Sequence, residues 1–276
     1  MNRVFSLKTS HVLLLIKLAL GLAIILPLIY CVSISLMTPG EIFSYPPRLF
    51  PRSLYGNNYQ ELFQTIPLLR FLLNSLLIAS ISTLSKILLN SLAAYAFAFF
   101  EFKGKKTLFF LILFAYMVPA ESVVIANFST IAKAELLDTL VAVLLPNLVS
   151  AMGVFVMRQH FLTLPQELRE AAELDGCGSL KFFVRIALPL TKSAVFSVAA
   201  IEFVGAWNMY LWPLLVTNST ENRTIQIGIS MLSFSDSQSF GLCAAGIVSA
   251  LVPPMLLFLF GKKNIVAGLT AGSLKG

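Results

Sequence analysis

Charged residues are scarce in this chain of 276 residues: they make up 12% of the sequence, while hydrophobic residues make up 57%. A soluble domain carries about a quarter charged residues. Together with a mean hydropathy of +0.84, this shortage argues against an ordinary soluble domain and indicates an integral membrane protein. The net charge of +7 is spread along the chain without a basic stripe, so nucleic-acid binding is not expected.

Motifs for metal, disulfide and nucleotide chemistry are also missing. The three cysteines and two histidines form no CxxC or Cys/His spacing, so neither a metal site nor a disulfide framework is predicted. The sequence has no HExxH and no GxxxxGK[ST] motif, and the second of these cradles nucleotide phosphates. We therefore expect no catalytic residues, no metal and no cofactor in this chain.

Six apolar segments are long enough to cross a bilayer core of about 30 Å. This pattern predicts an all-α membrane protein with a single transmembrane domain over residues 1–276. The expected spans cover about 14–36, 71–100, 108–128, 140–157, 193–216 and 242–260. Pro119 and Glu121 interrupt the third span, which suggests a broken helix whose unwound backbone lines a cavity.

Lysine and arginine are distributed unevenly between the two sides of these spans. Most lie in the N-terminus, the 101–106 loop, the segment after the fourth span and the tail at 261–276. Cytoplasmic loops carry the excess of basic residues in membrane proteins. We therefore place both termini in the cytoplasm.

One polar segment, residues 163–190, stands between the fourth and fifth spans. Its prolines and glycines predict two short helices around a turn: Pro165 starts the first helix at its N1 position, Gly176 and Gly178 permit the reversal, and Ser179 caps the second. Apolar residues at helical spacing form a strip along the first helix: Leu164, Leu168, Ala171, Ala172 and Leu174. Such an amphipathic helix pair would lie in the membrane interface or dock in a groove on a partner. The second helix should end at Leu188-Pro189.

The residues of this segment resemble the EAA loop of ABC importer permeases. Glu170-Ala171-Ala172, three residues, Gly176, nine residues and then Ile186-x-Leu188-Pro189 match every fixed position of that pattern. Two further stretches, Trp207-Asn208-x-Tyr210-Leu211-Trp212-Pro213-Leu214 and the Val266–Gly276 tail, resemble the carbohydrate-uptake branch. In that branch the chain is most similar to the second of two paired subunits, of the maltose and glycerol-3-phosphate type.

This resemblance implies a type I ABC importer permease fold in a bacterial inner membrane. It also implies three partners besides membrane lipid: a second permease subunit, a dimer of ATPase subunits that bind ATP and Mg, and an extracytoplasmic solute-binding protein. The segment at 163–190 would couple to the ATPase. Glu170 would pair with a partner arginine, cap a backbone group or remain a solvated charge on the helix. The residues assigned to this coupling are Glu170, Ala171, Ala172, Asp175, Gly176, Ile186, Leu188 and Pro189. The resemblance implies a tail that extends between the two ATPase subunits, whereas its composition alone equally fits a frayed terminus.

Ionisable residues inside spans are costly and are by default candidates for function. Lys86, near the middle of the second span, would attract an anionic solute or pair with an acid of the partner subunit. Glu121 would line a cavity or lie at the outer interface, and Glu202 would face the cavity or bond to a neighbouring helix. Asn208 and Tyr210 would contact a sugar or serve, with Trp207 and Trp212, as interfacial anchors and packing residues.

The sequence thus predicts a permease subunit of an ATP-driven importer for a carbohydrate or a glycerol-3-phosphate-like solute. Two alternatives are a permease for another small solute and a standalone carrier. A membrane-embedded enzyme is a third class, but the spans contain no convergent catalytic acids or histidines.

Overall fold

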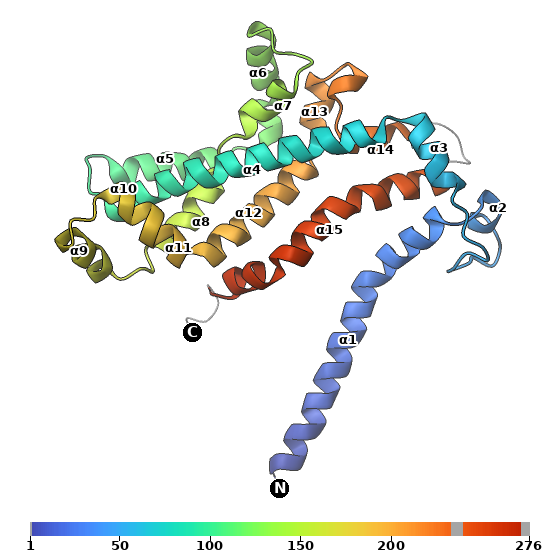
Figure 1. Ribbon diagram of the computed structural model, residues 1–276, viewed down its shortest axis with the longest axis horizontal. Coiled ribbons are helices and arrows are strands. Elements are labelled where there is room, and N and C mark those ends of the chain that lie inside the picture. Colours follow the sequence, from blue (N-terminus) through green and yellow to red (C-terminus); the bar gives the residue numbers. More distant parts are fainter. Residues whose placement is uncertain (1, 233–239, 272–276) are drawn as a thin grey trace. The chain divides into compact units, whose positions relative to one another are not determined.

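The computed structural model describes residues 2–232 and 240–271, and every element in this part of the chain is helical (Figure 1). The α-helices are α1 (Asn2–Ser35), α2 (Pro39–Ile42), α3 (Asn57–Thr65), α4 (Leu68–Phe99), α5 (Lys105–Met117), α6 (Ala120–Lys133), α7 (Leu140–Leu144), α8 (Ala151–Phe161), α9 (Gln166–Leu174), α10 (Ser179–Phe182), α11 (Leu188–Leu190), α12 (Lys192–Trp207), α13 (Leu211–Val216), α14 (Ile225–Leu232) and α15 (Phe240–Ala271). Short 3₁₀ turns are η1 (Leu145–Asn147) and η3 (Thr220–Asn222), and η2 (Phe183–Ala187) is a π-helical turn.

Three helices in the described residues are long and apolar enough to cross a membrane: Leu13–Ser35, Leu68–Phe99 and Phe240–Lys263. Three bent helix pairs also pass this test, so the number of spans rises to six if each bent pair is one span. The pairs are Lys105–Met117 with Ala120–Lys133, Leu140–Asn147 with Ala151–Phe161, and Ser179–Leu190 with Lys192–Trp207.

The expected third span is broken, as its proline indicated. The axes of α5 and α6 differ by 96°, and Pro119 stands between them as the N-cap of α6. Proline has no amide hydrogen to donate and its ring clashes with the preceding turn, so the helix stops there. Residues 108–128 therefore form two short helices instead of one.

The chain forms two compact units, the first from the described parts of Met1–Leu68 and Gly228–Leu251. In this unit the Asn58 side-chain amide donates to the carbonyls of Ser35 and Met37, both at 2.9 Å. A Cβ on Gly241 would lie 2.7 Å from the Asn58 amide. Glycine at 241 thus lets α15 approach the buried turn between α1 and α3.

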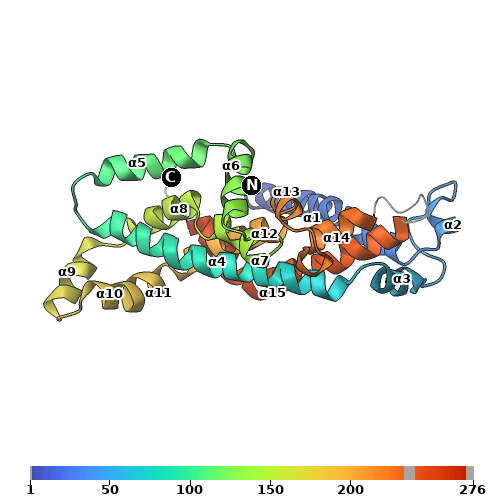
Figure 2. The same ribbon diagram turned by 90° about the horizontal axis from the view of Figure 1, so that it is seen from above.

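The second unit comprises Leu69–Ile227 and the described part of Val252–Gly276. Its main core joins Tyr95 and Phe97 of α4 to Met157 and Phe161 of α8 and to Phe182 of α10. A smaller core joins α4 to α6, α7 and α13 around Ile78, Ile131, Val143 and Trp212. Seen from above, α9 to α11 lie beside the end of α4 that leads into α5 (Figure 2).

The tail differs from expectation as far as it is described. Residues 261–271 continue α15 as a helix, and the Ile265 carbonyl accepts a 2.9 Å hydrogen bond from the Ser197 hydroxyl of α12. The glycines at 261 and 268 do not interrupt the helix, because glycine within a helix costs only about 1 kcal/mol. The prediction of an extended tail is therefore wrong for 261–271, and 272–276 lie outside the described residues.

Candidate functional site

The segment at 163–190 folds as two short helical stretches around a turn. Gly176, between α9 and α10, has φ of +71°, a left-handed conformation that glycine adopts without steric cost. Two details differ from the prediction. Pro165 is the N-cap of α9 and not its first residue, and Gly178 is the N-cap of α10, so Ser179 is already helical.

The second stretch also continues past its predicted end. It passes through η2 and α11 to Leu190. Pro189 has no amide to donate to the carbonyl of Arg185, and the wider π-helical turn at 183–187 immediately precedes it. The hydroxyl of Thr191 then donates to the Ala187 carbonyl at 2.8 Å, which satisfies one of the carbonyls at the helix end.

The residues of the predicted apolar strip lie on two different faces of α9. Ala172 is buried and Leu164 is half-buried against the main core, but the side chain of Leu174 is 90% exposed. Two residues along a helix rotate the side chain by about 200°. Leu174 therefore points away from the face that Ala172 buries.

Several contacts fix this segment to the end of α4. The Tyr95 hydroxyl donates to the Ser179 carbonyl at 3.0 Å, and the rings of Tyr95 and Phe183 are 5.1 Å apart. Arg169 donates to the Phe99 carbonyl and to Glu173. These contacts hold the segment against the end of α4.

The opposite face of the segment is open. Glu170 and Ala171 are exposed, and Glu170 accepts a 3.2 Å hydrogen bond from Gln166. Leu174, Leu180 and Val184 also expose their apolar side chains. The structure thus leaves Glu170, Ala171 and these three apolar side chains exposed, while the pairing of Glu170 with a partner stays a prediction.

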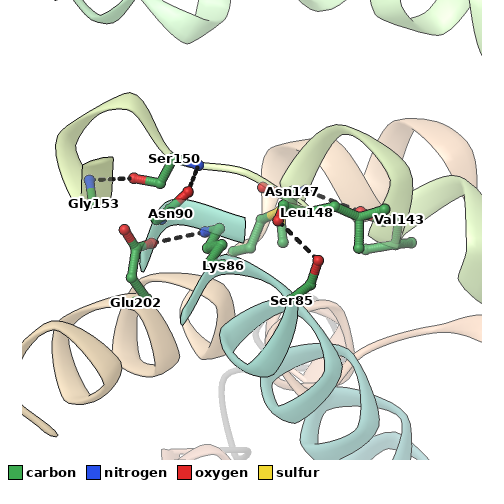
Figure 3. A network of polar contacts seen from close by, with 10 residues as sticks. Ser85, Lys86, Asn90, Val143, Asn147, Leu148, Ser150, Gly153 and Glu202 are labelled. Carbon is green, nitrogen blue, oxygen red and sulfur yellow. Dashed lines mark hydrogen bonds and ion pairs between the residues drawn. The ribbon is translucent and has the colours of Figure 1, made fainter. Parts of the chain in front are cut away.

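Two of the predicted pathway residues form an ion pair inside the second unit. The Lys86 ammonium of α4 lies 2.8 Å from the Glu202 carboxylate of α12 (Figure 3), with 10% and 14% of the two side chains exposed. Lys86 thus has an acid partner within its own chain. A buried charge of this kind costs several kcal/mol when its partner is removed.

Neighbouring polar groups hold a helix break next to this pair. Asn90 follows Lys86 by one turn of α4, and its carbonyl oxygen accepts from the Ser150 amide at 3.2 Å. The Ser85 hydroxyl donates to the Leu148 carbonyl at 3.0 Å. Figure 3 shows these side chains reaching from α4 toward the break between η1 and α8. Side chains of α4 therefore satisfy the backbone groups that the 44° bend at this break leaves unpaired.

Gly153 permits the close approach at this break. A Cβ at this position would lie 2.1 Å from the Asn90 amide nitrogen and 3.4 Å from a Glu202 oxygen. Only glycine therefore fits beneath Asn90 without displacing it. The ion pair, Asn90 and Gly153 form one buried cluster.

A cavity of about 480 Å³ adjoins this cluster. Lys86, Glu121 and Tyr210 line it together, with Asn127 and Asn147 as further polar groups and Met209 and Trp212 among its apolar walls. The structure thus brings three of the five candidate pathway residues around one space. Their contact with a solute stays a prediction.

Asn208 and the two tryptophans lie elsewhere or serve packing. The Asn208 side chain is exposed and accepts a 3.4 Å hydrogen bond from Gln226, and it does not line the cavity. Trp207 is buried and stacks on Phe203 with ring centres 6.0 Å apart. Trp212 donates its indole hydrogen to the Ala142 carbonyl at 3.1 Å. Packing, one of the expected roles, is thus present for both tryptophans.

Residues 86–265 match the family of binding-protein-dependent transport system inner membrane components. This match covers more than half of the chain, from Lys86 through the segment at 163–190 to α15. The chain belongs to this family. The permease fold expected from the EAA residues is therefore confirmed, and the chain is an inner-membrane transport component with several apolar helices.

Curated relatives of this permease are similar over most of their length. An arabinooligosaccharides transport system permease protein, AraQ, of Halalkalibacterium halodurans is 36% identical over 203 residues, covering 74% of this chain and 73% of the relative. The sn-glycerol-3-phosphate transport system permease protein UgpE of Pectobacterium atrosepticum is 32% identical over 268 residues and covers 94% of each chain.

Solved structures with the same fold include a bacterial ABC transporter involved in the import of the acidic polysaccharide alginate. One of its chains matches with a TM-score of 0.80 at 19% identity, over 95% of this permease and 96% of that chain. A second structure, of the alginate transporter in complex with an alginate pentasaccharide-bound periplasmic protein, matches with a TM-score of 0.64 at 17% identity. At these low identities, the two matches show that the fold is shared.

Sequence reasoning missed the residues that surround the ion pair of the permease. Asn90 and Ser85 were overlooked because neither is charged, although both lie within four residues of Lys86. A polar residue one turn from a buried charge shares its helix face, and this was the available signal. Nothing in the sequence marked Gly153, because its role depends on a side chain 63 positions away.

Proposed function

We propose that this permease is one of two transmembrane subunits of an ATP-driven importer for a carbohydrate or a glycerol-3-phosphate-like solute. A second permease subunit completes the pathway, two ATPase subunits bind ATP and Mg, and an extracytoplasmic binding protein delivers the solute. Both termini and the segment at 163–190, which we call the coupling segment, lie in the cytoplasm. The chain itself catalyses no reaction. The names of the AraQ and UgpE relatives and the lysine and arginine distribution support this proposal.

The structure of the coupling segment is the main support for this proposal. The segment is anchored firmly on one face, through Tyr95, Phe183 and Arg169. It is bare on the other face, where Glu170 and Leu174 are exposed. An exposed apolar and acidic helical surface fits a groove on a partner protein. Asp175 and Gly176 form the turn at its tip, and Ile186, Leu188 and Pro189 form the connection back to α12.

Within this solute class, the cavity favours an uncharged molecule. Glu202 neutralises Lys86 at 2.8 Å, and Glu121 has no ion-pair partner among the described residues. The charged groups at the cavity therefore leave one negative charge unbalanced, which disfavours an anion. Hydroxyl-rich solutes find hydrogen-bonding partners in Asn127, Asn147 and Tyr210. We therefore propose that the pathway half in this chain is built for a neutral carbohydrate.

Affinity purification of the full-length chain from its native membrane tests the proposed partnership. We expect an ATPase subunit that contains a GxxxxGK[ST] motif to copurify with the wild type. Leu174→Asp should reduce its recovery at least tenfold, because a charge on the apolar docking face must be desolvated. Leu54→Asp, which alters another exposed leucine far along the sequence, is the control and should retain the ATPase. Absence of any such ATPase from the wild-type sample would contradict the proposal.

A further inference from the structure

A second cavity, of about 610 Å³, lies between the end of α4, the loop at 100–104, the start of α5 and α8. Four aromatic side chains and three cationic side chains line it. The aromatic residues are Phe97, Phe102, Phe109 and Phe110, and the cations are Lys105, Lys106 and Arg158. None of these residues takes part in the proposed pathway or in the exposed face of the coupling segment.

Two of these cations form no ion pair with a residue in the described part of the chain. Lys105 pairs with Glu101 at 2.8 Å, and Glu101 is the cavity's one acidic residue. Lys106 is exposed and forms no ion pair with a described residue. The cavity therefore has an excess of positive charge, which favours the binding of an anionic ligand.

Arg158 is held in place for such a ligand. Its Nε donates to the Phe97 carbonyl at 3.2 Å, and its guanidinium carbon lies 4.4 Å from the centre of the Phe109 ring. The terminal nitrogens donate no hydrogen bond to a described residue. An immobilised guanidinium with free planar donors is suited to bind phosphate oxygens in a bidentate manner.

The surface next to Lys106 is apolar and follows one face of α5. Phe110, Phe114 and Met117 succeed Lys106 at spacings of four, four and three residues, which place them along one side of the helix. Their side chains are 68%, 70% and 74% exposed. A cationic end followed by an exposed apolar stripe of about three turns matches a molecule with an anionic head and a hydrocarbon tail.

We propose that this cavity binds an anionic phospholipid, with the headgroup phosphate between Arg158 and Lys106 and an acyl chain along Phe110, Phe114 and Met117. Basic pockets between transmembrane helices favour anionic headgroups, and each nearby lysine or arginine contributes about a fivefold gain in affinity. A free phosphate ion would use the same cations but would gain nothing from the apolar stripe.

Native mass spectrometry of the purified full-length chain, with titrated phosphatidylglycerol and phosphatidylcholine, tests this site. We expect about a tenfold or larger preference for phosphatidylglycerol in the wild type. The double variant Lys106→Gln/Arg158→Gln should abolish the preference. The control Lys133→Gln/Lys181→Gln removes the same charge at two exposed lysines outside the cavity and should keep it. Equal binding of the two lipids by the wild type, or an equal loss in the control, would overturn the proposal.

Thr107→Asp provides a variant that keeps the fold. An acid in the first turn of α5 favours the helix dipole, so this change should leave α5 stable while repelling an anionic headgroup. We expect a several-fold drop in phosphatidylglycerol affinity without loss of thermal stability, and unchanged affinity would contradict the site. Displacement of the bound lipid by millimolar inorganic phosphate would overturn the proposal in favour of a simple ion site. In the variant Phe110→Cys, protection of the new thiol from a thiol reagent by a copurified protein would overturn it in favour of a protein interface.

Discussion

Lys86 and Glu202, which are 116 positions apart in the sequence, form an ion pair of 2.8 Å between α4 and α12. The pair lies where α4 also holds the break between η1 and α8 through Asn90. The pair joins α4 to α12, and Asn90 joins α4 to the break between η1 and α8. The coupling segment contacts the same α4 through Tyr95 and leads directly into α12.

Removing one charge of this pair should destabilise the permease strongly. We expect Lys86→Met and Glu202→Gln each to cost about 3–5 kcal/mol, since a buried charge then loses its partner. The reversed pair, Lys86→Glu/Glu202→Lys, should recover most of that loss because the attraction does not depend on which helix carries which sign. Thermal unfolding of the detergent-solubilised complex measures the effect. Additive losses in the reversed pair would show that the two residues do not interact.

Gly153 provides a test of the packing beneath Asn90. Gly153→Ala would place a Cβ 2.1 Å from the Asn90 amide nitrogen, so Asn90 must move and its bond from Ser150 is lost. We expect a loss of about 1–3 kcal/mol in stability, the usual range for overpacking. Gly205→Ala is the matched control, because its Cβ would meet nothing within 4 Å. That change should instead stabilise α12 by about 0.5–1 kcal/mol. A stability of Gly153→Ala equal to that of the control would contradict the packing described.

Asp138 links the loop after α6 to the loop after α13 and makes this link sensitive to acid. Hydrogen bonds from the backbone amides of Ser219 and Asn218, each 2.9 Å, lower the pKa of its carboxyl below the ordinary value of 3.8. A lowered pKa in the folded state stabilises the fold at pH above that ordinary value, and the contribution is lost as pH falls through the folded pKa.

Asp138→Asn should remove this acid sensitivity. Asparagine tolerates the left-handed backbone at this position, where φ is +58°, and it keeps a side-chain oxygen as acceptor. We therefore expect the variant to be less stable than the wild type at neutral pH, with the difference shrinking below pH 3.8. Thermal unfolding followed from pH 7 to pH 3 measures this. A difference that stays constant over that range would exclude the proposed role of the carboxylate charge.

The coupling segment could be predicted from the sequence because its signals are local. Proline, glycine and the EAA spacing determine helix ends and a turn within 30 residues, and the same holds for the break at Pro119. The pairing of Lys86 with Glu202 could not be predicted, since nothing in either segment specifies which residue faces it across the bundle. The helical continuation of 261–271 was missed because small residues carry little periodicity, while the contact from Ser197 to Ile265 lies outside the local pattern.

We propose that the segment at 163–190 transmits force from a partner ATPase to the pathway. The most direct test is the ratio of solute uptake to ATP hydrolysis in proteoliposomes that contain the complete transporter. Gly176→Val introduces a β-branched side chain at φ +71°, where it is strongly disfavoured. Gly178→Val is the matched control, because Gly178 has φ of −64° and both positions have open space for a Cβ. We predict that Gly176→Val lowers the ratio at least tenfold while Gly178→Val leaves it near that of the wild type; an unchanged ratio in Gly176→Val would contradict the account.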